Sequence, residues 1–462
     1  MSMKKKRIIS LAVSASLLTG VTAVSAAPPQ TSNVQAQSAF DNKITKSINV
    51  ENIYQHIEEL SKEPRVAGTA AEYRAVQYIK DQFESYGYKT EIQPFTFESY
   101  IAPTAVSLSV NGQALSATPF TYTTSGSSSA ELVLAGLGKE SDFEGKDIEG
   151  KIALIERGEI SFGEKVLNAT NAGAVGVIIY NNTEGEINGT LGEWNASLAP
   201  AVSLTQAQGE ALIAQLEENG SLSVSLTVEG AKIEETTSHN VIATKLPTNK
   251  KKATNQIVMA GSHHDSVAGA PGANDDASGV AVTLELARVL ANKPTDTEIR
   301  FMTFGAEELG LLGSYHYVDT LTEDEIDRTA AMFQMDMVGS RDAGDLVMFT
   351  VDGEKNTVTE LGAAAGVRTG TPLTYGAEGR SDHVPFYYAG IPAALFIHSP
   401  VEPWYHTPED TIDKISKEKL QDTAEIVGAA IYQIARPDTP ALTKSKVAPQ
   451  PVEYEKYTGG LQ

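Results

Sequence analysis

GSHHDSVAGAPGANDDASG, residues 261–279, is the stretch of sequence that decides the fold. It follows a short apolar run, residues 257–260, that predicts a buried strand. It ends where an apolar segment with helical spacing begins, over residues 279–291. A Gly- and Pro-rich loop between strand and helix is typical of an open α/β sheet, which binds ligands at the carboxyl ends of its strands. The histidines and aspartates of this stretch therefore follow a strand, at the position where such a fold has its ligand-binding site.

The alternation of strands and helices continues from residue 240 onward. Three further apolar runs of strand length occupy residues 300–304, 332–337 and 393–397. Such alternation predicts a mixed, mainly parallel sheet that is sandwiched by helices. Nearer the amino end, apolar residues at helical spacing predict two amphipathic helices, and these precede a strand that begins at residue 89.

Polar clusters follow three of the other expected strands. Taken singly, paired acids and a loop histidine are usually solvated surface residues, but together they offer a metal ion the imidazole and carboxylate ligands that zinc accepts. Asp336 lies among apolar residues, where an unpaired carboxylate is costly, and a divalent cation supplies the missing charge. The clusters are FMTFGAEELGLLGS (residues 301–314), FQMDMVGS (333–340) and WYHTPEDT (404–411).

The four clusters together resemble the bacterial leucyl-type di-zinc aminopeptidases, a family of zinc exopeptidases. The likeness covers residues 47–102 and 236–436, which we expect to form the catalytic domain. It implies two zinc ions per chain, with one aspartate bridging both. By this resemblance the ligands are Asp275 as the bridge, His263 and Asp336 at one ion, and Glu308 and His406 at the other.

The same resemblance assigns roles to residues around the ligands. Glu307 would be the general base, and Asp265 would orient the imidazole of His263. The hydroxyl of Tyr405 would face the developing oxyanion, although an aromatic plug beside Trp404 is the alternative interpretation of this tyrosine. A cis peptide bond would follow Asp275, and the second histidine of the pair, His264, would be structural.

Specificity depends on the segment GRSDHVPFYYAGIPAALF, residues 379–396, which is similar to the corresponding segment of the family. That likeness implies that Arg380, Met337 and Phe396 approach the pocket for the first side chain of the substrate. An apolar pocket favours Leu, Met or Phe. Asp382 and His383 equally fit a hydrogen-bonded pair that supports the loop.

Residues 103–235 differ in texture from the rest of the chain. They contain short strand patterns, Gly-rich turns and no histidine. The segment DIEGKIALIERGEISFGEKVLNATNAGAVGVIIYNN, residues 147–182, resembles the protease-associated (PA) domain that is inserted in several exopeptidases, and a generic small α/β domain is the alternative. We expect this unit to bind or gate peptides rather than to catalyse.

The amino end of the chain predicts export. Basic residues at 4–7 precede an apolar run that closes on Val24-Ser25-Ala26, so residues 1–26 have the pattern of a secretory signal peptide. A membrane anchor is the alternative, but the apolar stretch is short for one. Residues 27–46 and 437–462 lack an apolar period, and we expect a flexible leader or pro-segment and a flexible tail.

The composition of the chain limits which binding partners and which kinds of catalytic chemistry are expected. The chain has 462 residues, which favours two domains, and a formal net charge of −23, which disfavours nucleic acid and anionic membranes as partners. It contains no cysteine, so disulfides and a cysteine nucleophile are excluded. We expect a secreted monomer that acts on peptides without contacting a membrane after signal cleavage.

Three functions compete at this stage. A zinc carboxypeptidase could use the same metal ligands, but it should present several cations to the substrate carboxylate, and the sequence offers only Arg380 and Arg341 near the site. A receptor-like binding protein could keep the fold, but such proteins lose ligands that are all present here. The sequence therefore predicts a zinc aminopeptidase that removes residues from the free amino end of peptides, with Glu307 as base.

Overall fold

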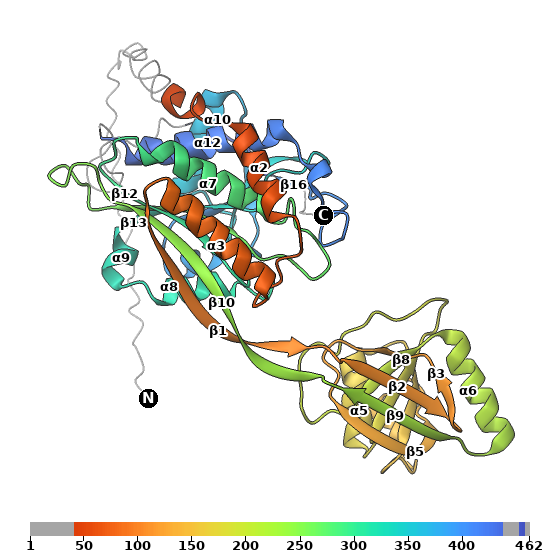
Figure 1. Ribbon diagram of the computed structural model, residues 1–462. Helices are drawn as coiled ribbons and strands as arrows, with labels where there is room; N and C mark the ends of the chain where they lie inside the picture. Colours follow the sequence, from red (N-terminus) through yellow and green to blue (C-terminus); the bar gives the residue numbers. More distant parts are fainter. Residues whose placement is uncertain (1–40, 438–451, 458–462) are drawn as a thin grey trace, which may run out of the picture.

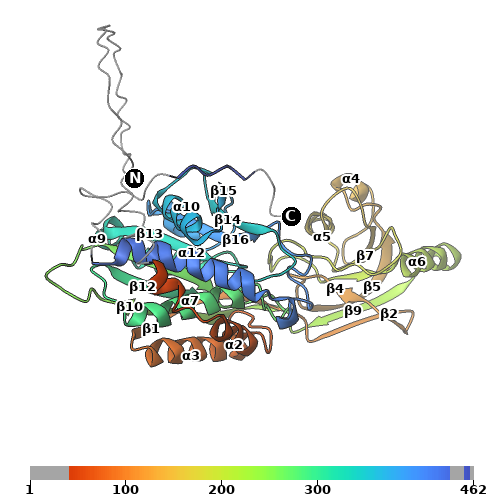
Figure 2. The ribbon, with the colours of Figure 1, turned by 90° about the horizontal axis from the view of Figure 1, so that it is seen from above.

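The computed structural model describes residues 41–437 and 452–457, which form two parts joined by a ribbon of two long strands (Figure 1). The larger part has an eight-stranded sheet in the order β1-β10-β12-β11-β13-β16-β14-β15, and the smaller part has an eight-stranded sheet in the order β3-β2-β9-β5-β6-β7-β8-β4. The view from above shows the smaller part to one side of the larger one (Figure 2). This architecture confirms the expected mixed α/β fold with a small inserted α/β unit.

Parallel strands form the centre of the larger sheet. β11 lies between β12 and β13, and β16 follows β13, with all these neighbours parallel. β10 and β14 border them antiparallel, and β15 pairs with β14 in parallel. The strands are β11 (Ile257–His263), β12 (Glu298–Phe304), β13 (Thr329–Met335), β14 (Asp345–Thr350), β15 (Thr374–Ala377) and β16 (Ala393–Ser399).

Helices cover both faces of this sheet. Successive strand residues point to opposite sides, so an apolar strand presents apolar side chains to both layers of helices. Val258 and Ala260 of β11 belong to the core under α2, α3, α7, α10 and α12, whereas Ile257 and Met259 belong to the core under α8 and α11. Figure 1 shows α2, α3 and α7 on the near face. The helices are α2 (Val50–Leu60), α3 (Ala70–Ser85), α7 (Ala277–Ala291), α8 (Leu312–Asp319), α9 (Glu323–Arg328), α10 (Thr357–Thr369), α11 (His383–Tyr388) and α12 (Lys417–Ala435).

The ribbon consists of β1 (Lys89–Ile101) and β10 (Lys232–Lys245), which pair antiparallel from one end of β1 to the other. Within β10, only residues 241–245 pair with β12, so residues 232–240 extend beyond the larger sheet. Because β12 runs antiparallel to β10, the ribbon leaves the sheet at the carboxyl end of β12. The smaller part therefore lies beyond the edge that carries the polar clusters.

The smaller part has its own cores on the two faces of its sheet. Its strands β5 to β8 are parallel neighbours, and short helices connect β5 to β6 and β6 to β7. All of these elements lie inside the expected range 103–235. They are β2 (Ala105–Val110), β3 (Gln113–Leu115), β4 (Thr118–Pro119), β5 (Gly126–Leu134), α4 (Glu140–Phe143), β6 (Ile152–Glu156), α5 (Phe162–Asn171), β7 (Gly176–Tyr180), β8 (Ala201–Leu204), α6 (Gln206–Asn219) and β9 (Ser223–Glu229).

Two segments expected to be flexible are packed against the larger part. Residues 41–45 are helical, and Ile44 is fully buried in the core. Residues 452–457 lie beside β15, where the backbone N–H of Tyr375 donates to the carbonyl of Glu455 over 3.1 Å. The leader and tail expectations therefore need correction for these residues.

The expected signal peptide, residues 1–26, lies outside the described residues, as does most of the expected leader and tail. Within residues 41–437 and 452–457, no helix combines the length and the apolar character that crossing a bilayer requires.

Candidate metal centre

The predicted ligands come together at the carboxyl ends of the central strands. His263 is the last residue of β11, Asp336 follows β13 directly, and Glu307 and Glu308 follow β12 after two residues. Parallel neighbours place their carboxyl ends at one edge, which is why residues far apart in sequence meet here. The ligand set and Glu307 line one cavity of about 540 Å³.

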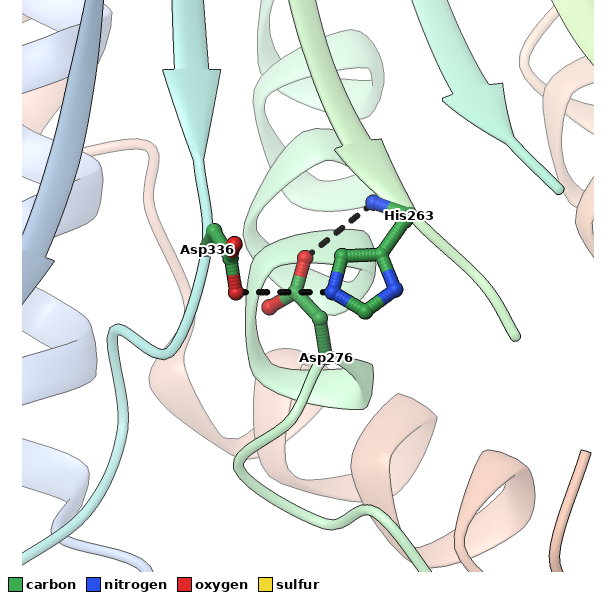
Figure 3. Close-up of side chains that lie close together, drawn as sticks. All are labelled: His263, Asp276 and Asp336. Atoms are coloured by element: carbon green, nitrogen blue, oxygen red, sulfur yellow. Dashed lines mark hydrogen bonds and ion pairs between the residues drawn. The ribbon is translucent and has the colours of Figure 1, made fainter. Parts of the chain in front are cut away.

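The carboxylate of Asp275 lies between two imidazoles. Its Oδ1 is 3.1 Å from Nε2 of His263, and its Oδ2 is 3.2 Å from Nε2 of His406. Oε2 of Glu308 lies 3.0 Å from the same His406 nitrogen. Oδ1 of Asp336 lies 3.5 Å from Nε2 of His263 (Figure 3). The five side chains thus form two adjoining groups that share Asp275.

These distances fit two metal positions. Zinc binds histidine and carboxylate at about 2.0–2.1 Å in tetrahedral sites, so neighbouring ligand atoms stand about 3.3–3.4 Å apart. The nitrogen-to-oxygen distances within the two groups, 3.0–3.5 Å, match that spacing. Oδ1 of Asp336 and Oε1 of Glu308 are buried without a hydrogen-bond partner among the described residues. A cation in each group would satisfy both atoms.

Asp276 also lies within ligand distance of His263 and Asp336. Its oxygens are nevertheless occupied, because they accept the backbone N–H groups of His263 at 3.2 Å (Figure 3), Gly279 at 2.8 Å and Met337 at 3.1 Å. Asp276 caps the start of α7 and ties it to the ends of β11 and β13. We therefore assign it a structural role that the sequence did not reveal.

Asp265 supports both the histidine ligand and the two glutamates. Its Oδ1 lies 3.5 Å from Nδ1 of His263, and its carboxylate accepts the backbone N–H groups of Glu307 at 3.1 Å and Glu308 at 3.3 Å. A negative group beside Nδ1 leaves Nε2 to face the metal position. The peptide bond between Asp275 and Asp276 is cis, as the family resemblance implies.

The loop that carries Asp275 rests on residues that sequence reasoning missed. The carboxylate of Asp410 accepts the backbone N–H groups of Asn274 at 2.8 Å and Asp275 at 3.1 Å. Glu402 accepts a hydrogen bond from the side-chain amide of Asn274 over 2.7 Å. Burial raises the pKa of Asp410 to about 6 and that of Glu402 to about 7. Asp410 lies within the cluster WYHTPEDT, which the sequence singles out. Its hydrogen bonds to the backbone of Asn274 and Asp275 could not be predicted from that cluster.

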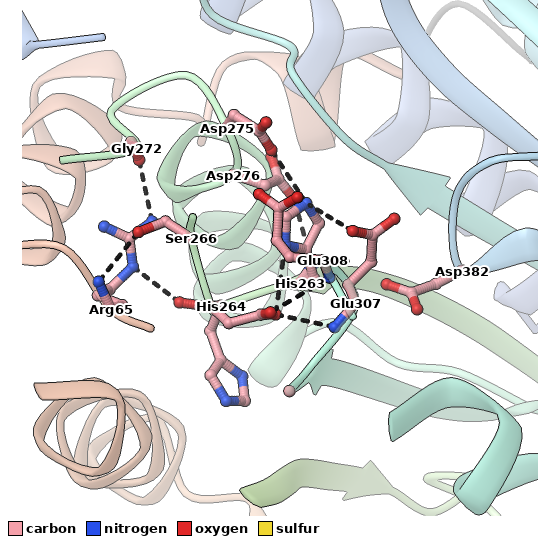
Figure 4. A network of polar contacts seen from close by, with 12 residues as sticks. Arg65, His263, His264, Ser266, Gly272, Asp275, Asp276, Glu307, Glu308 and Asp382 are labelled. Atoms are coloured by element: carbon pink, nitrogen blue, oxygen red, sulfur yellow. Dashed lines mark hydrogen bonds and ion pairs between the residues drawn. The ribbon is translucent and has the colours of Figure 1, made fainter. Parts of the chain in front are cut away.

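Arg65 holds the other side of the same loop. Its side chain is almost fully buried and its guanidinium donates to backbone carbonyls (Figure 4). The carbonyl acceptors are those of Leu60, His264, Pro271 and Gly272. A buried guanidinium needs such a set of acceptors, because each unpaired donor would cost free energy. No motif in the sequence marks Arg65.

Buried acids dominate the electrostatics of the site. Burial, with the nearby charges of Asp382 and Asp336, raises the pKa of Glu307 well above its usual range. Burial and the charge of Asp275 raise the pKa of Glu308 to about 7. Several carboxylates and two imidazoles in one enclosed space leave a surplus of negative charge. Divalent cations would remove that surplus.

The wall of the cavity differs from its prediction at one position. Met337 and Arg380 line the cavity as expected, but Phe396 does not. Its ring is fully buried on the other face of β16, with its centroid 5.9 Å from that of Phe333. Leu395 and Ile397 line the cavity instead, because neighbours on a strand alternate in direction.

The remaining predicted residues support or border the cavity. The carboxylate of Asp382 accepts hydrogen bonds from Ser314 Oγ at 2.5 Å and from the side-chain amide of Gln334 at 3.3 Å. His383 bonds instead through Nε2 to the carbonyl of Glu378 over 2.8 Å, so both residues support the loop through separate partners.

Two further predicted residues border the ligands. Tyr405 lines the cavity, and its ring stacks on His406 with the centroids 3.8 Å apart. His264 is fully buried, and its Nδ1 bonds to Thr303 Oγ1 over 3.0 Å, which suits a structural residue.

Comparison with known proteins agrees with this site. Residues 240–431 match peptidase family M28, and residues 128–212 match the PA domain. The solved aminopeptidase of Aneurinibacillus sp. strain AM-1 is 57% identical, with a TM-score of 0.73 over 90% of this chain and 100% of that one.

Two further comparisons involve Bacillus subtilis. The solved zinc aminopeptidase BSAP is 39% identical, with a TM-score of 0.68 over 87% of this chain and 98% of that one. Aminopeptidase YwaD is 41% identical over 406 residues, which are 85% of this chain and 86% of the relative. The chain therefore belongs to peptidase family M28, as an aminopeptidase whose smaller part contains a PA domain.

Proposed function

We propose that this chain is a secreted zinc aminopeptidase that uses two zinc ions to remove apolar residues such as leucine from the free amino end of peptides. The position of Asp275 carries the proposal, since each of its two oxygens lies beside a different imidazole. Such a carboxylate suits a bridge between two cations. The similarity to a protein described as a zinc aminopeptidase supports zinc as the metal.

The proposed ligands divide between the two ions as the geometry groups them. His263 and Asp336 would hold one ion, Glu308 and His406 the other, and Asp275 both. When bound, such an ion pair polarises the scissile carbonyl and lowers the pKa of the attacking water. The rest of the chemistry falls to side chains of this chain.

Glu307 is the proposed general base. It lines the cavity beside the ligands, its Oε2 is 4.0 Å from Nε2 of His263, and Asp265 fixes its backbone. Its place in the cavity beside the proposed ligands suits a carboxylate that takes a proton from the attacking water. The same carboxyl group can then protonate the departing amine. Tyr405 is the proposed donor to the oxyanion, and its place in the cavity beside His406 supports that role.

The proposed preference for apolar first residues rests on one wall of the cavity. Met337, Leu395 and Ile397 belong to one apolar cluster and line the cavity next to the ligands. Among the described lining residues Arg380 is the only Arg or Lys, and it already pairs with Glu378 over 2.8 Å. A wall of this kind suits an uncharged side chain and offers no free cation to a substrate carboxylate.

The first test is digestion of a leucine-led hexapeptide in the presence of zinc, with the products followed by mass spectrometry. We expect stepwise loss of residues from the amino end, and no loss after chelation or when the peptide is N-acetylated. Shortening from the carboxyl end would contradict the proposed polarity. Secretion is tested separately, by sequencing the amino end of protein recovered from the culture medium, where we expect cleavage after Ala26.

Replacing Asp265 by asparagine should weaken zinc binding by roughly 10–100-fold, because the carboxylate no longer orients His263. The measurement is a zinc titration of the chelator-treated protein. Asp81→Asn is the matched control, since this aspartate is exposed on α3 and should leave zinc affinity unchanged. Unaltered affinity in Asp265→Asn would show that the imidazole is oriented by other contacts.

A further inference from the structure

The catalytic cavity is larger than the first side chain of a substrate requires. Its volume is about 540 Å³. A leucine side chain has four heavy atoms, and at roughly the 30 Å³ that one water occupies in the liquid it fills roughly 120 Å³. The apolar wall of Met337, Leu395 and Ile397 therefore accounts for only part of the space. The remainder is available to the part of the peptide beyond the scissile bond.

A second part of the cavity lining is aromatic and exposed. Nine large apolar side chains are exposed among the described residues, and three of them, Tyr315, Tyr388 and Tyr405, line this one cavity. Tyr388 is 69% exposed and Tyr315 is 40% exposed. Scattered apolar residues on a surface need no explanation, but a cluster at the rim of a cavity indicates a binding surface. Tyrosine suits such a rim because its ring is apolar and its hydroxyl can stay in water.

Tyr315 and Tyr388 are carried by two helices that are joined to each other. Tyr315 is in the first turn of α8, Tyr388 ends α11, and Ser314 Oγ joins the two helices by its 2.5 Å bond to Asp382. In the core that these helices cover, the rings of Phe304, Tyr317 and Phe386 pack against one another with centroids 6.0–6.1 Å apart. A rim held in this way loses little conformational freedom when a ligand binds.

The proposed mechanism places the leaving part of the peptide beside the loop that leads to Tyr315. The proposed proton donor to the departing amine is Glu307, so the residue that begins with that amine must lie next to the loop of Glu307. That loop runs directly into α8, because the backbone N–H groups of Gly310 and Leu311 both donate to the carbonyl of Glu307 over 2.8 Å. Tyr315 follows within one turn.

We propose that Tyr315 and Tyr388 bind the second residue of the substrate, so that the enzyme acts best on peptides whose second residue is bulky and apolar. The proposal rests on the proposed function and adds a second specificity site to it. It predicts that two peptides with the same first residue are hydrolysed at different rates according to the second residue.

The test compares leucyl-phenylalanine amide with leucyl-glycine amide on the zinc-loaded protein. We expect kcat/KM to be roughly tenfold higher for the phenylalanine peptide, as burial of part of one aromatic ring would give. The double variant Tyr315→Ser/Tyr388→Ser should reduce this ratio to about two or less, on the same scale. Tyr388→Phe, which keeps the ring, should preserve the ratio. Tyr73→Ser is the matched control, because Tyr73 is exposed but does not line the cavity.

The outcomes separate the two proposals. Equal kcat/KM for both peptides in the unaltered protein, or an undiminished ratio in the double variant, overturns the second-residue site and leaves the aminopeptidase function in place. Hydrolysis of neither peptide overturns the proposed function and this inference with it. Thermal unfolding of the double variant shows whether it is folded, and if it is not, Tyr315→Ser and Tyr388→Ser measured singly decide the same ratio.

Discussion

Replacing Glu307 by glutamine should lower kcat by about 10²–10⁴-fold, the range that a positioned general base contributes, while zinc binding is preserved. The amide has the shape of the carboxylate but cannot accept the proton of the attacking water. Because Glu307 is not a proposed ligand, the variant should still bind two zinc ions per chain. Initial rates on a leucine-led peptide and the zinc content of the purified protein measure the two effects together.

The matched control for this variant is Glu409→Gln, an exposed glutamate in the loop that carries His406. It should change neither the rate nor the zinc content. Loss of zinc from Glu307→Gln would show that Glu307 is a ligand rather than the base. Retention of full activity would assign the base to another group, and Glu307 would then have no chemical role.

Replacing Asp275 by asparagine should have a comparably large effect for a different reason. One carboxylate lies beside both His263 and His406, so its loss weakens both proposed metal positions at once. We expect activity to fall by about 10³-fold or more, beyond the roughly 10–100-fold effect of a residue that only supports a ligand. The zinc-dependent rise in melting temperature should also disappear, since that rise depends on binding to the folded state.

Asp336→Asn separates a shared ligand from an unshared one. It should remove one zinc ion per chain and leave the ion at Glu308 and His406 in place. Metal analysis after gel filtration gives the ratio of zinc to protein for each variant. A ratio near one for Asp275→Asn, equal to that of Asp336→Asn, would contradict the bridging role.

The residues that the sequence singles out as ligands lie together in the structure because they follow short apolar runs. His263 ends a strand, and Glu308 and Asp336 each follow a strand within a few residues. Neighbouring parallel strands end at the same edge of the sheet, so these residues are expected to meet there even when the packing of side chains is unknown. Phe396 was misplaced because every residue of β16 is buried, so alternation of polar and apolar residues gives no sign of which face each side chain occupies.

The supporting residues could not be predicted in the same way. Arg65 bonds to backbone carbonyls about two hundred positions away, and backbone acceptors carry no sequence signal. The packed ends were missed for a related reason. Ile44, Tyr454 and Tyr457 are apolar residues in mainly polar segments, and the core residues that they contact are distant in the sequence.

The paired ribbon has a consequence for how such a chain can gain or lose its PA domain. β1 and β10 match residue for residue, with Phe97 opposite Thr236, so a two-residue turn placed after this pair would close an ordinary hairpin. Every strand of the peptidase sheet would keep its neighbours. Deleting the intervening residues is therefore a direct route to a minimal peptidase, because the domain occupies the place of one hairpin loop.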